Sequence, residues 1–267
     1  MNTHFTLNTL DDYAIAAVHT ITSRKRIILW LHGITVNKDE YLNFFKDGAE
    51  YLANKDFDSL RIDFRGHGSS SGSSLDFSIV GQMLDVECAM SFISKTYSRN
   101  ISVYIVGCSF GAPPAIYTAL NYPKLVKGIV LISPVISYRR TFLEPETDWG
   151  KSIFNKKALS LLPTRKELRI DDDFHISPRL IEEMKIIRPD LALKDVKQSV
   201  TIIHGDADSM VPYAAARDVA NEIVGVKFFS MSRMDHGFMD KKDECGTSER
   251  SQNNKIRIFD IISENCS

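Results

Sequence analysis

The sequence predicts the α/β fold class, with a mainly parallel, twisted sheet flanked by helices and a helical insertion. Two observations predict the sheet. Apolar runs of strand length alternate with longer segments of helical period, and these runs are rich in β-branched residues, as buried parallel strands are. A third observation predicts the insertion, because this alternation stops after residue 136 and resumes only at residue 198.

The N-terminal part of the predicted sheet begins with an exposed strand and reaches the sheet centre at residues 101–107. Polar and apolar residues alternate over residues 13–22, as in an antiparallel strand with one face in water. Residues 101–107 (ISVYIVG) form the most β-branched run in the chain, which favours a central strand. The other expected elements here are strands at residues 26–31 and 59–64 and helices at residues 39–54 and 77–95.

The C-terminal part of the predicted sheet follows the same alternation. We expect a helix over residues 110–120 although it contains Pro113 and Pro114, because the first turn of a helix tolerates proline. A polar segment at residues 241–254 predicts a surface loop. The remaining expected elements are strands at residues 126–133, 200–204 and 226–231 and helices at residues 213–223 and 255–264.

Residues 137–197 are expected to form the insertion. Four prolines divide this segment into short helical pieces, and apolar runs of strand length are missing from it. We therefore predict a helical cap at residues 137–197, carried by a core domain made of residues 1–136 and 198–267.

The expected cap has one clear helix signal and a surplus of apolar residues. Over residues 178–187, Ser177 can cap the first turn, and Glu182 and Glu183 lie near the positive end of the helix dipole. The aspartates at residues 171–173 are interpreted as a solvated helix-capping run, because no companion metal ligands stand at a suitable spacing. Some apolar cap residues should face a cleft, while at least half should hold the cap on the sheet; they are Phe142, Trp149, Phe154, Leu159, Leu161, Leu162, Phe174, Ile181, Met184 and Ile187.

Composition excludes several classes of partner. The 267 residues carry 33 Lys and Arg against 34 Asp and Glu, so neither nucleic acid nor an anionic membrane finds a basic stripe. The four cysteines lack metal-ligand spacing, which predicts reduced thiols and no structural zinc. Neither a leader-like N-terminus nor a run of membrane-spanning length is seen. The expectation is a cytoplasmic protein without metal or organic cofactor.

The central strand ends in a G-x-S-x-G motif, GCSFG at residues 107–111, directly before a predicted helix. A nucleophile on such a sharp strand-to-helix turn sits in a strained backbone, and flanking glycines relieve the crowding. The amides at the start of the helix can stabilise a developing oxyanion. The motif therefore makes Ser109 a candidate nucleophile.

A serine nucleophile needs a base and an orienting acid, and both types occur after later strands. The segment HGDADSMVP at residues 204–212 supplies Asp206 and Asp208, and DHG at residues 235–237 supplies His236. The chain order serine, aspartate, histidine distinguishes this arrangement from the other common serine-hydrolase orders.

Five segments together resemble the α/β-hydrolase superfamily, in particular its monoacylglycerol lipase-like and feruloyl-esterase-like branch with a serine aminopeptidase profile. They are LHGIT at 31–35, DFRGHGSSSG at 63–72, GCSFG at 107–111, HGDADSMVP at 204–212 and DHGF at 235–238. The resemblance spans nearly the whole chain except the insertion and the C-terminal tail. It implies the α/β-hydrolase fold.

The resemblance also implies a role for each site residue. Ser109 would be the nucleophile, Asp208 the orienting acid and His236 the general base. The backbone amides of Ile34 and Phe110 would form the oxyanion hole. The H-G-x-x-D-x-x-V-P spacing of the family selects Asp208 rather than Asp206.

Three nearby residues have competing interpretations. His32 and His67 could take part in the chemistry but are expected to fix turns beside the site. Cys108 departs from the family, which often has histidine there. We expect it to be a small packing residue rather than a nucleophile, because no base is evident for it.

The expected reaction is hydrolysis of a small to medium apolar acyl or aryl ester through an acyl-enzyme. An acyl-thioesterase or acyltransferase would use the same residues, and peptidase activity is a weaker alternative. A ligand-binding protein without turnover is the hypothesis from a different class. The expected partner is a small-molecule ester or thioester.

Overall fold

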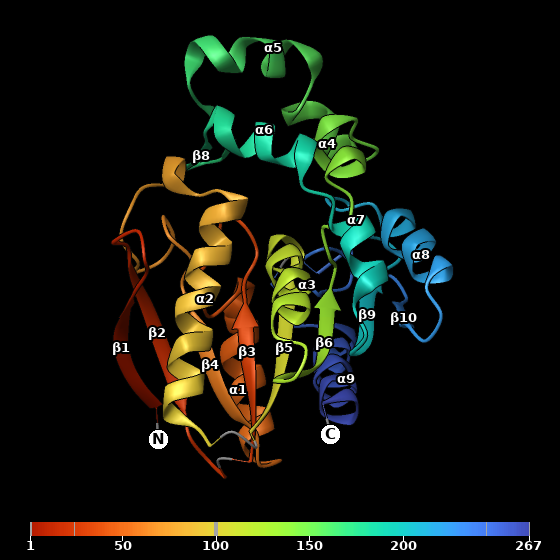
Figure 1. Ribbon diagram of the computed structural model, residues 1–267. Coiled ribbons are helices and arrows are strands. Elements are labelled where there is room, and N and C mark those ends of the chain that lie inside the picture. Colours follow the sequence, from red (N-terminus) through yellow and green to blue (C-terminus); the bar gives the residue numbers. More distant parts are fainter. Residues whose placement is uncertain (1, 24, 99–100, 244, 267) are drawn as a thin grey trace.

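The computed structural model describes residues 2–23, 25–98, 101–243 and 245–266. Its centre is an eight-stranded sheet in the order β1-β2-β4-β3-β5-β6-β9-β10 (Figure 1). Neighbouring strands from β4 to β10 are parallel, whereas β2 pairs antiparallel with both β1 and β4, so the predicted mainly parallel α/β sheet is confirmed. The strands are β1 (Asn2–Asn8), β2 (Ala14–Thr20), β3 (Arg26–Leu31), β4 (Asp58–Ile62), β5 (Ser102–Cys108), β6 (Val126–Ile132), β9 (Ser199–Gly205) and β10 (Lys227–Met231).

Helices cover both faces of the sheet. Because successive strand residues point to opposite faces, Leu29 and Leu31 of β3 belong to one buried cluster and Ile28 and Trp30 to the other. The first cluster is shared with α2 (Ile79–Thr96), α3 (Ala112–Asn121) and α8 (Tyr213–Glu222), and the second with α1 (Phe44–Ala53) and α9 (Glu249–Asn265).

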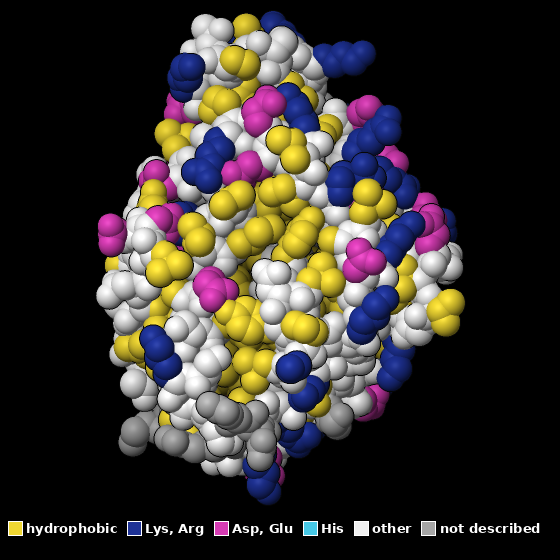
Figure 2. Space-filling view, in the orientation of Figure 1, with side chains coloured by type: hydrophobic (Ala, Val, Ile, Leu, Met, Phe, Trp, Pro, Cys, Tyr) yellow, Lys and Arg dark blue, Asp and Glu magenta, His cyan; other side chains and the backbone are white. Residues whose placement is uncertain are grey.

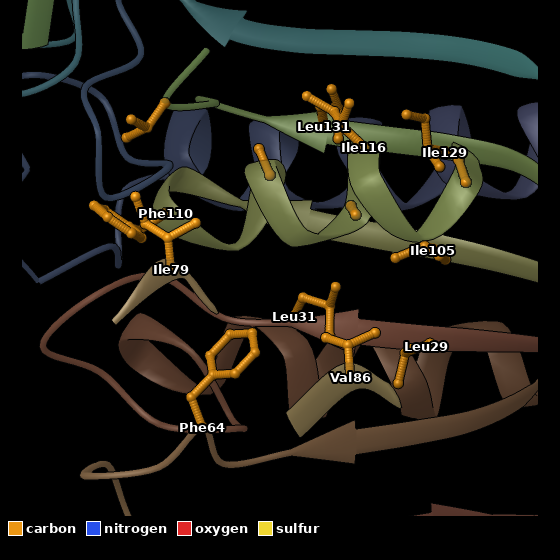
Figure 3. Packing of buried hydrophobic residues seen from close by; sticks show 14 of the residues in the cluster. Leu29, Leu31, Phe64, Ile79, Val86, Ile105, Phe110, Ile116, Ile129 and Leu131 are labelled. Atoms are coloured by element: carbon orange, nitrogen blue, oxygen red, sulfur yellow. The ribbon is translucent and has the colours of Figure 1, made fainter. Parts of the chain in front are cut away.

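The packing of α2 and α3 fixes the strand ends near the candidate site. Figure 3 shows Val86 of α2 beside Leu29 and Leu31 of β3, and Ile116 of α3 near Leu131 of β6. All five side chains are at most 1% exposed. Full burial stabilises the folded state by about 1.5–3 kcal/mol for each such side chain, so the ends of β3 and β6 are held firmly.

Most of the chain between β6 and β9 lies beyond the carboxyl ends of the parallel strands, and its last part returns beside α3 to the start of β9 (Figure 1). Its elements are η4 (Arg139–Leu143), α4 (Asp148–Ile153), α5 (Lys156–Arg165), β7 (Leu168–Asp171), β8 (Phe174–Ile176), α6 (Pro178–Ile186), α7 (Pro189–Ala192) and η5 (Leu193–Asp195). The segment was expected to be helical, but β7 and β8 pair within it as an antiparallel hairpin. The aspartates at residues 171–173 end β7 and turn this hairpin, so they do not cap a helix.

Two interactions expected at the start of α6 differ in the structure. Ser177 occupies the position before the helix, but its hydroxyl caps no amide. Glu183 pairs with Arg179 of its own helix through Oε1, while its Oε2 accepts hydrogen bonds from the amides of Ile79 and Val80 at the start of α2, at 2.6 and 3.3 Å. This contact ties α6 to the core.

Two helices begin five or six residues away from the expected position, and one strand was not expected. Helix α1 begins at Phe44 instead of residue 39, because Glu40 and Leu42 adopt positive φ. Helix α9 begins at Glu249 instead of residue 255, with Ser248 accepting the Ser251 amide at its start. Strand β1 was not expected, because the mostly polar, exposed segment carries a weak strand pattern.

The face that carries α2 and α3 has a surface of mixed polarity. Figure 2 shows hydrophobic side chains gathered over the middle of the face that carries α2 and α3, with basic and acidic side chains interspersed around them. Among the residues described, no helix has the length and apolarity needed to cross a bilayer, and no cluster of metal-ligating side chains occurs. The free thiols are Cys88, Cys108, Cys245 and Cys266.

Candidate active site

Ser109 lies at the turn between β5 and α3. Its φ of 48° is a strained value for a residue with a side chain. A Cβ at Gly107 would come within 2.6 Å of the Gly111 carbonyl oxygen, and a Cβ at Gly111 would overlap the Leu31 carbonyl. Both flanking positions therefore require glycine for the turn to close.

His236 and Asp208 meet Ser109 from two other loops. Asp208 follows β9, and His236 follows β10, the neighbouring parallel strand. His236 Nε2 lies 3.0 Å from Ser109 Oγ, and His236 Nδ1 lies 2.9 Å from Asp208 Oδ2. The three side chains thus form one continuous hydrogen-bonded chain.

Asp208 is buried but surrounded by donors. Its Oδ1 accepts the amides of Met210 and Val211 at 2.9 and 2.8 Å, and its Oδ2 faces His236 Nδ1 and also His204 Nε2, the latter at 3.1 Å. Burial alone would raise the pKa of Asp208, but the charge of His236 and the hydrogen bonds of both histidines hold it well below its usual value. The group is therefore a carboxylate throughout the neutral range.

The local charges favour protonation of His236. Burial alone would lower the pKa of His236, but the carboxylates of Asp208, Glu40 and Asp235 raise it above the usual value. Such surroundings stabilise the imidazolium that forms when the histidine accepts a proton.

Asp206 lies two residues before Asp208 and has a local contact. Its Oδ1 accepts the Arg233 amide at 2.6 Å, which links the loop after β9 to the loop after β10. Among the described residues, Asp206 and His236 share no hydrogen bond.

The loop after β3 presents the Ile34 amide, and three side chains fix that loop. His32 Nδ1 lies 2.6 Å from the Gly33 carbonyl, and His32 Nε2 lies 3.0 Å from the Phe64 amide. Because a carbonyl only accepts and an amide only donates, Nδ1 of His32 carries the hydrogen. The Gly33 carbonyl and the Ile34 N–H belong to one planar peptide group and point in opposite directions. Holding the carbonyl therefore orients the amide.

His67 fixes the same loop one residue later. Its Nδ1 lies 3.1 Å from the Arg65 carbonyl, so its Nε2, 3.3 Å away, accepts the Thr35 amide. Burial lowers the pKa of both His32 and His67 to about 3, so they remain neutral at neutral pH. Both histidines make turn-fixing contacts and neither has a recorded hydrogen bond to Ser109, among residues that the structure describes.

Glu40 is a site residue that the sequence interpretation missed. Its carboxyl oxygens accept the amides of Gly33 and Tyr41 at 2.8 and 3.1 Å, so it joins both ends of the loop. Burial raises the pKa of Glu40, while these amides and His236 act in the opposite direction. Glu40 stands seven residues after Gly33, in a segment expected to form a helix. The sequence therefore gave no indication that its carboxylate would bind the amides of this loop.

Cys108 packs behind Ser109. Its side chain is 1% exposed, and burial raises the pKa of the thiol well above its ordinary value, with the Glu40 carboxyl adding to the effect. A protonated, buried thiol is a poor nucleophile. The position therefore has the properties of a packing residue.

A cavity of about 520 Å³ opens beside Ser109. Of the apolar residues expected to face a cleft, Phe142 and Trp149 line it. Phe154, Leu162 and Phe174 are instead buried in the main core cluster. Further lining residues are Gly33, Ile34, Thr35, Val36, Glu40, Tyr41, Cys108, Val135, Asp171, Ser209, Met210, Val211, Asp235, His236, Gly237, Phe238, Met239, Asp240, Lys241 and Asp243.

Comparison with protein families and curated proteins finds a family model and relatives that match part of the chain. The family model described as serine aminopeptidase, S33 matches residues 22–192. A probable alcohol acetyltransferase of Cyberlindnera fabianii is 29% identical over 146 residues, which cover 54% of this chain and 36% of that protein. A monoglyceride lipase homolog of Monkeypox virus is 27% identical over 139 residues, covering 51% and 49%. The chain thus spans about a third to a half of the length of these relatives.

Solved structures share the fold over the full chain. Est1E from Butyrivibrio proteoclasticus with bound ferulic acid has a TM-score of 0.77 at 18% identity and covers 98% of each chain. A putative hydrolase from Agrobacterium vitis S4 has a TM-score of 0.79 at 17% identity, covering 100% of this chain and 99% of the other. At these identities the likeness concerns the fold.

Proposed function

Because the chain belongs to the serine aminopeptidase S33 family of α/β hydrolases, we propose that it is a serine hydrolase of carboxylic esters with a small to medium apolar acyl or aryl group. The observation that carries the proposal is the hydrogen-bonded chain from Ser109 through His236 to Asp208, beside a cavity of about 520 Å³. Such a chain supplies a nucleophile, a base and an orienting acid.

In the proposed mechanism Ser109 Oγ attacks the ester carbonyl carbon while His236 takes the serine proton. The amides of Ile34 and Phe110 bind the oxyanion of the tetrahedral intermediate. His236 then gives its proton to the leaving alcohol, and an acyl-enzyme remains on Ser109. Water attacks this ester by the same steps in reverse, which releases the acid. Asp208 holds the His236 tautomer that keeps Nε2 free to accept.

The charges around the cavity favour a neutral ester over a coenzyme A thioester. Asp171, Asp235 and Asp243 line the cavity, and Lys241 is the basic residue among the described lining residues. The phosphates of coenzyme A would need several basic partners. A neutral alcohol leaving group needs none.

Acyl transfer to an alcohol is the second candidate function. It is supported by the relative described as a probable alcohol acetyltransferase. Both reactions share the acyl-enzyme and differ in whether water or an alcohol attacks it. Hydrolysis in the presence of a series of alcohols measures this partition directly, by the yield of new ester.

We also propose that residues 137–197 act as a cap that shapes the acyl site. This proposal is supported by the position of most of the segment beyond the strand ends (Figure 1) and by Phe142 and Trp149 in the cavity lining. The larger share of its apolar side chains would then hold the cap on the core.

The proposed function is tested with Ser109→Ala. We expect turnover of 4-nitrophenyl esters to fall by about 10⁴–10⁶, and a fluorophosphonate probe to label wild type but not the variant. Ser160→Ala, which replaces an exposed serine of α5, is the control and should behave as wild type. A folded Ser109→Ala protein that retained more than about a tenth of wild-type turnover would refute the assignment.

A further inference from the structure

His204 is a buried histidine that the mechanism above does not use. It lies near the end of β9 and is 0% exposed. Its Nε2 is 3.1 Å from Asp208 Oδ2, the same oxygen that His236 Nδ1 approaches at 2.9 Å. Two histidines therefore share one oxygen of the carboxylate.

We propose that His204 is a positioning residue that donates its Nε2 hydrogen to Asp208 Oδ2 and thereby weakens the hold of Asp208 on the His236 proton. The inference rests on the proposed function of Ser109, His236 and Asp208. It assigns His204 a share in setting the pH range in which His236 acts as a base.

The hydrogen bond to Asp208 is the contact that orients the His204 ring. Its edge packs against the Tyr213 ring, with centroids 5.5 Å apart, and its Nδ1 is buried with no hydrogen-bond partner among described residues. An unpartnered buried nitrogen disfavours the folded state. An apolar side chain of similar size would fill the space without that penalty, so the particular contribution of histidine here is its donor.

The expected sign of the effect follows from the charges around His236. Asp208, Glu40 and Asp235 face His236 and favour its protonated form, and His204 and His236 both face Asp208. A second donor on Oδ2 withdraws negative charge from the oxygen that holds His236. Removing that donor therefore strengthens the pull on the His236 proton and moves its protonation to higher pH.

The test compares His204→Leu with His204→Gln, using kcat/KM for 4-nitrophenyl butyrate as a function of pH. His236 must be neutral to accept the serine proton, so activity falls as pH drops through its pKa. We expect the acid limb of the Leu variant to move up by about 0.5–1 pH unit and its plateau kcat/KM to fall about tenfold. The Gln variant keeps an N–H donor, and its acid limb should stay near that of wild type.

Two results would overturn the proposal on its own, while wild type still hydrolyses esters and reacts with fluorophosphonate. One is an unshifted acid limb in the Leu variant, and the other is the same shift in both variants. Loss of wild-type turnover and labelling would instead count against the proposed function.

Nitrogen-15 NMR of the wild-type ring tests the donor directly, even if the Leu variant does not fold. We expect the hydrogen of His204 on Nε2 throughout the range in which His236 titrates. A hydrogen on Nδ1 alone would refute the proposal, whatever the activity.

Discussion

Replacing Asp208 by asparagine should remove most of the activity without removing the fold. The Asp208 carboxylate accepts four hydrogen bonds, two from backbone amides on Oδ1 and two from histidines on Oδ2. Asparagine has one acceptor oxygen. If that oxygen keeps the amides of Met210 and Val211, its NH₂ group faces His236 Nδ1, which must then become an acceptor. The hydrogen of His236 then lies on Nε2 and faces Ser109, so Nε2 can no longer accept the serine proton.

The size of the effect follows from this tautomer change. In the chymotrypsin-type triad the same substitution lowers kcat about 10⁴-fold, which corresponds to about 5 kcal/mol of activation free energy. Both backbone amides keep their acceptor, so the loop after β9 should hold its conformation. We therefore expect a loss in kcat of this order and a much smaller loss in the free energy of unfolding.

Asp206→Asn is the matched control, because Asp206 lies in the same loop and its carboxylate accepts the Arg233 amide. This exposed contact should cost about 0.5–1.5 kcal/mol of folding free energy when weakened, with kcat within about threefold of wild type. The assay is kcat for a 4-nitrophenyl ester, measured beside urea unfolding of each variant. Equal losses of turnover in the two folded variants, or a larger loss in the Asp206 variant, would show that the wrong carboxylate has been chosen.

Two further substitutions address the cavity. Glu40→Gln removes a negative charge that favours protonated His236, so the acid limb of kcat/KM should move to lower pH by up to about 1 unit. This shift is opposite to the one expected for His204→Leu, and an upward shift would contradict the reasoning. Trp149→Ala removes apolar lining, so the gain in kcat/KM per added acyl methylene, at most about 0.8 kcal/mol, should shrink. Leu159→Ala, a change in the same segment outside this cavity, is the control, and equal slopes for the two variants would argue against a role of Trp149 in acyl selection.

One property of parallel sheets allows the sequence to predict that three loops, distant in the chain, lie close together in space. Parallel strands end at the same edge of a sheet, so residues that follow β5, β9 and β10 come together there. Ser109, Asp208 and His236 each follow one of these strands, and the structure brings them within hydrogen-bond distance. Apolar runs mark strand ends well enough for this inference, even where the boundaries shift by one or two residues.

Other parts of the site depend on contacts that no local pattern reveals. Apolar side chains have helical spacing over residues 39–54, yet Glu40 and Leu42 take positive φ and the helix begins later. The compensating interaction is Glu40 with the Gly33 amide, which exists only once the loop has folded back. His204 is visible in the HGDADSMVP segment, but its contact with Asp208 depends on the path of the loop between them.

The same contacts explain how the site can hold a strained backbone. Thr35, Glu40 and Ser109 all have positive φ, at a cost of about 1–3 kcal/mol each. Each is countered by a specific partner: His67 holds the Thr35 amide, Glu40 holds the Gly33 amide, and the tight packing at Gly111 closes the turn at Ser109. Since these partners are buried and the strands beneath them are firmly packed, the loop cannot relax without unfolding part of the core. These contacts therefore keep the Ile34 amide and the Ser109 hydroxyl in fixed positions before a substrate arrives, as the proposed stabilisation of an oxyanion would require.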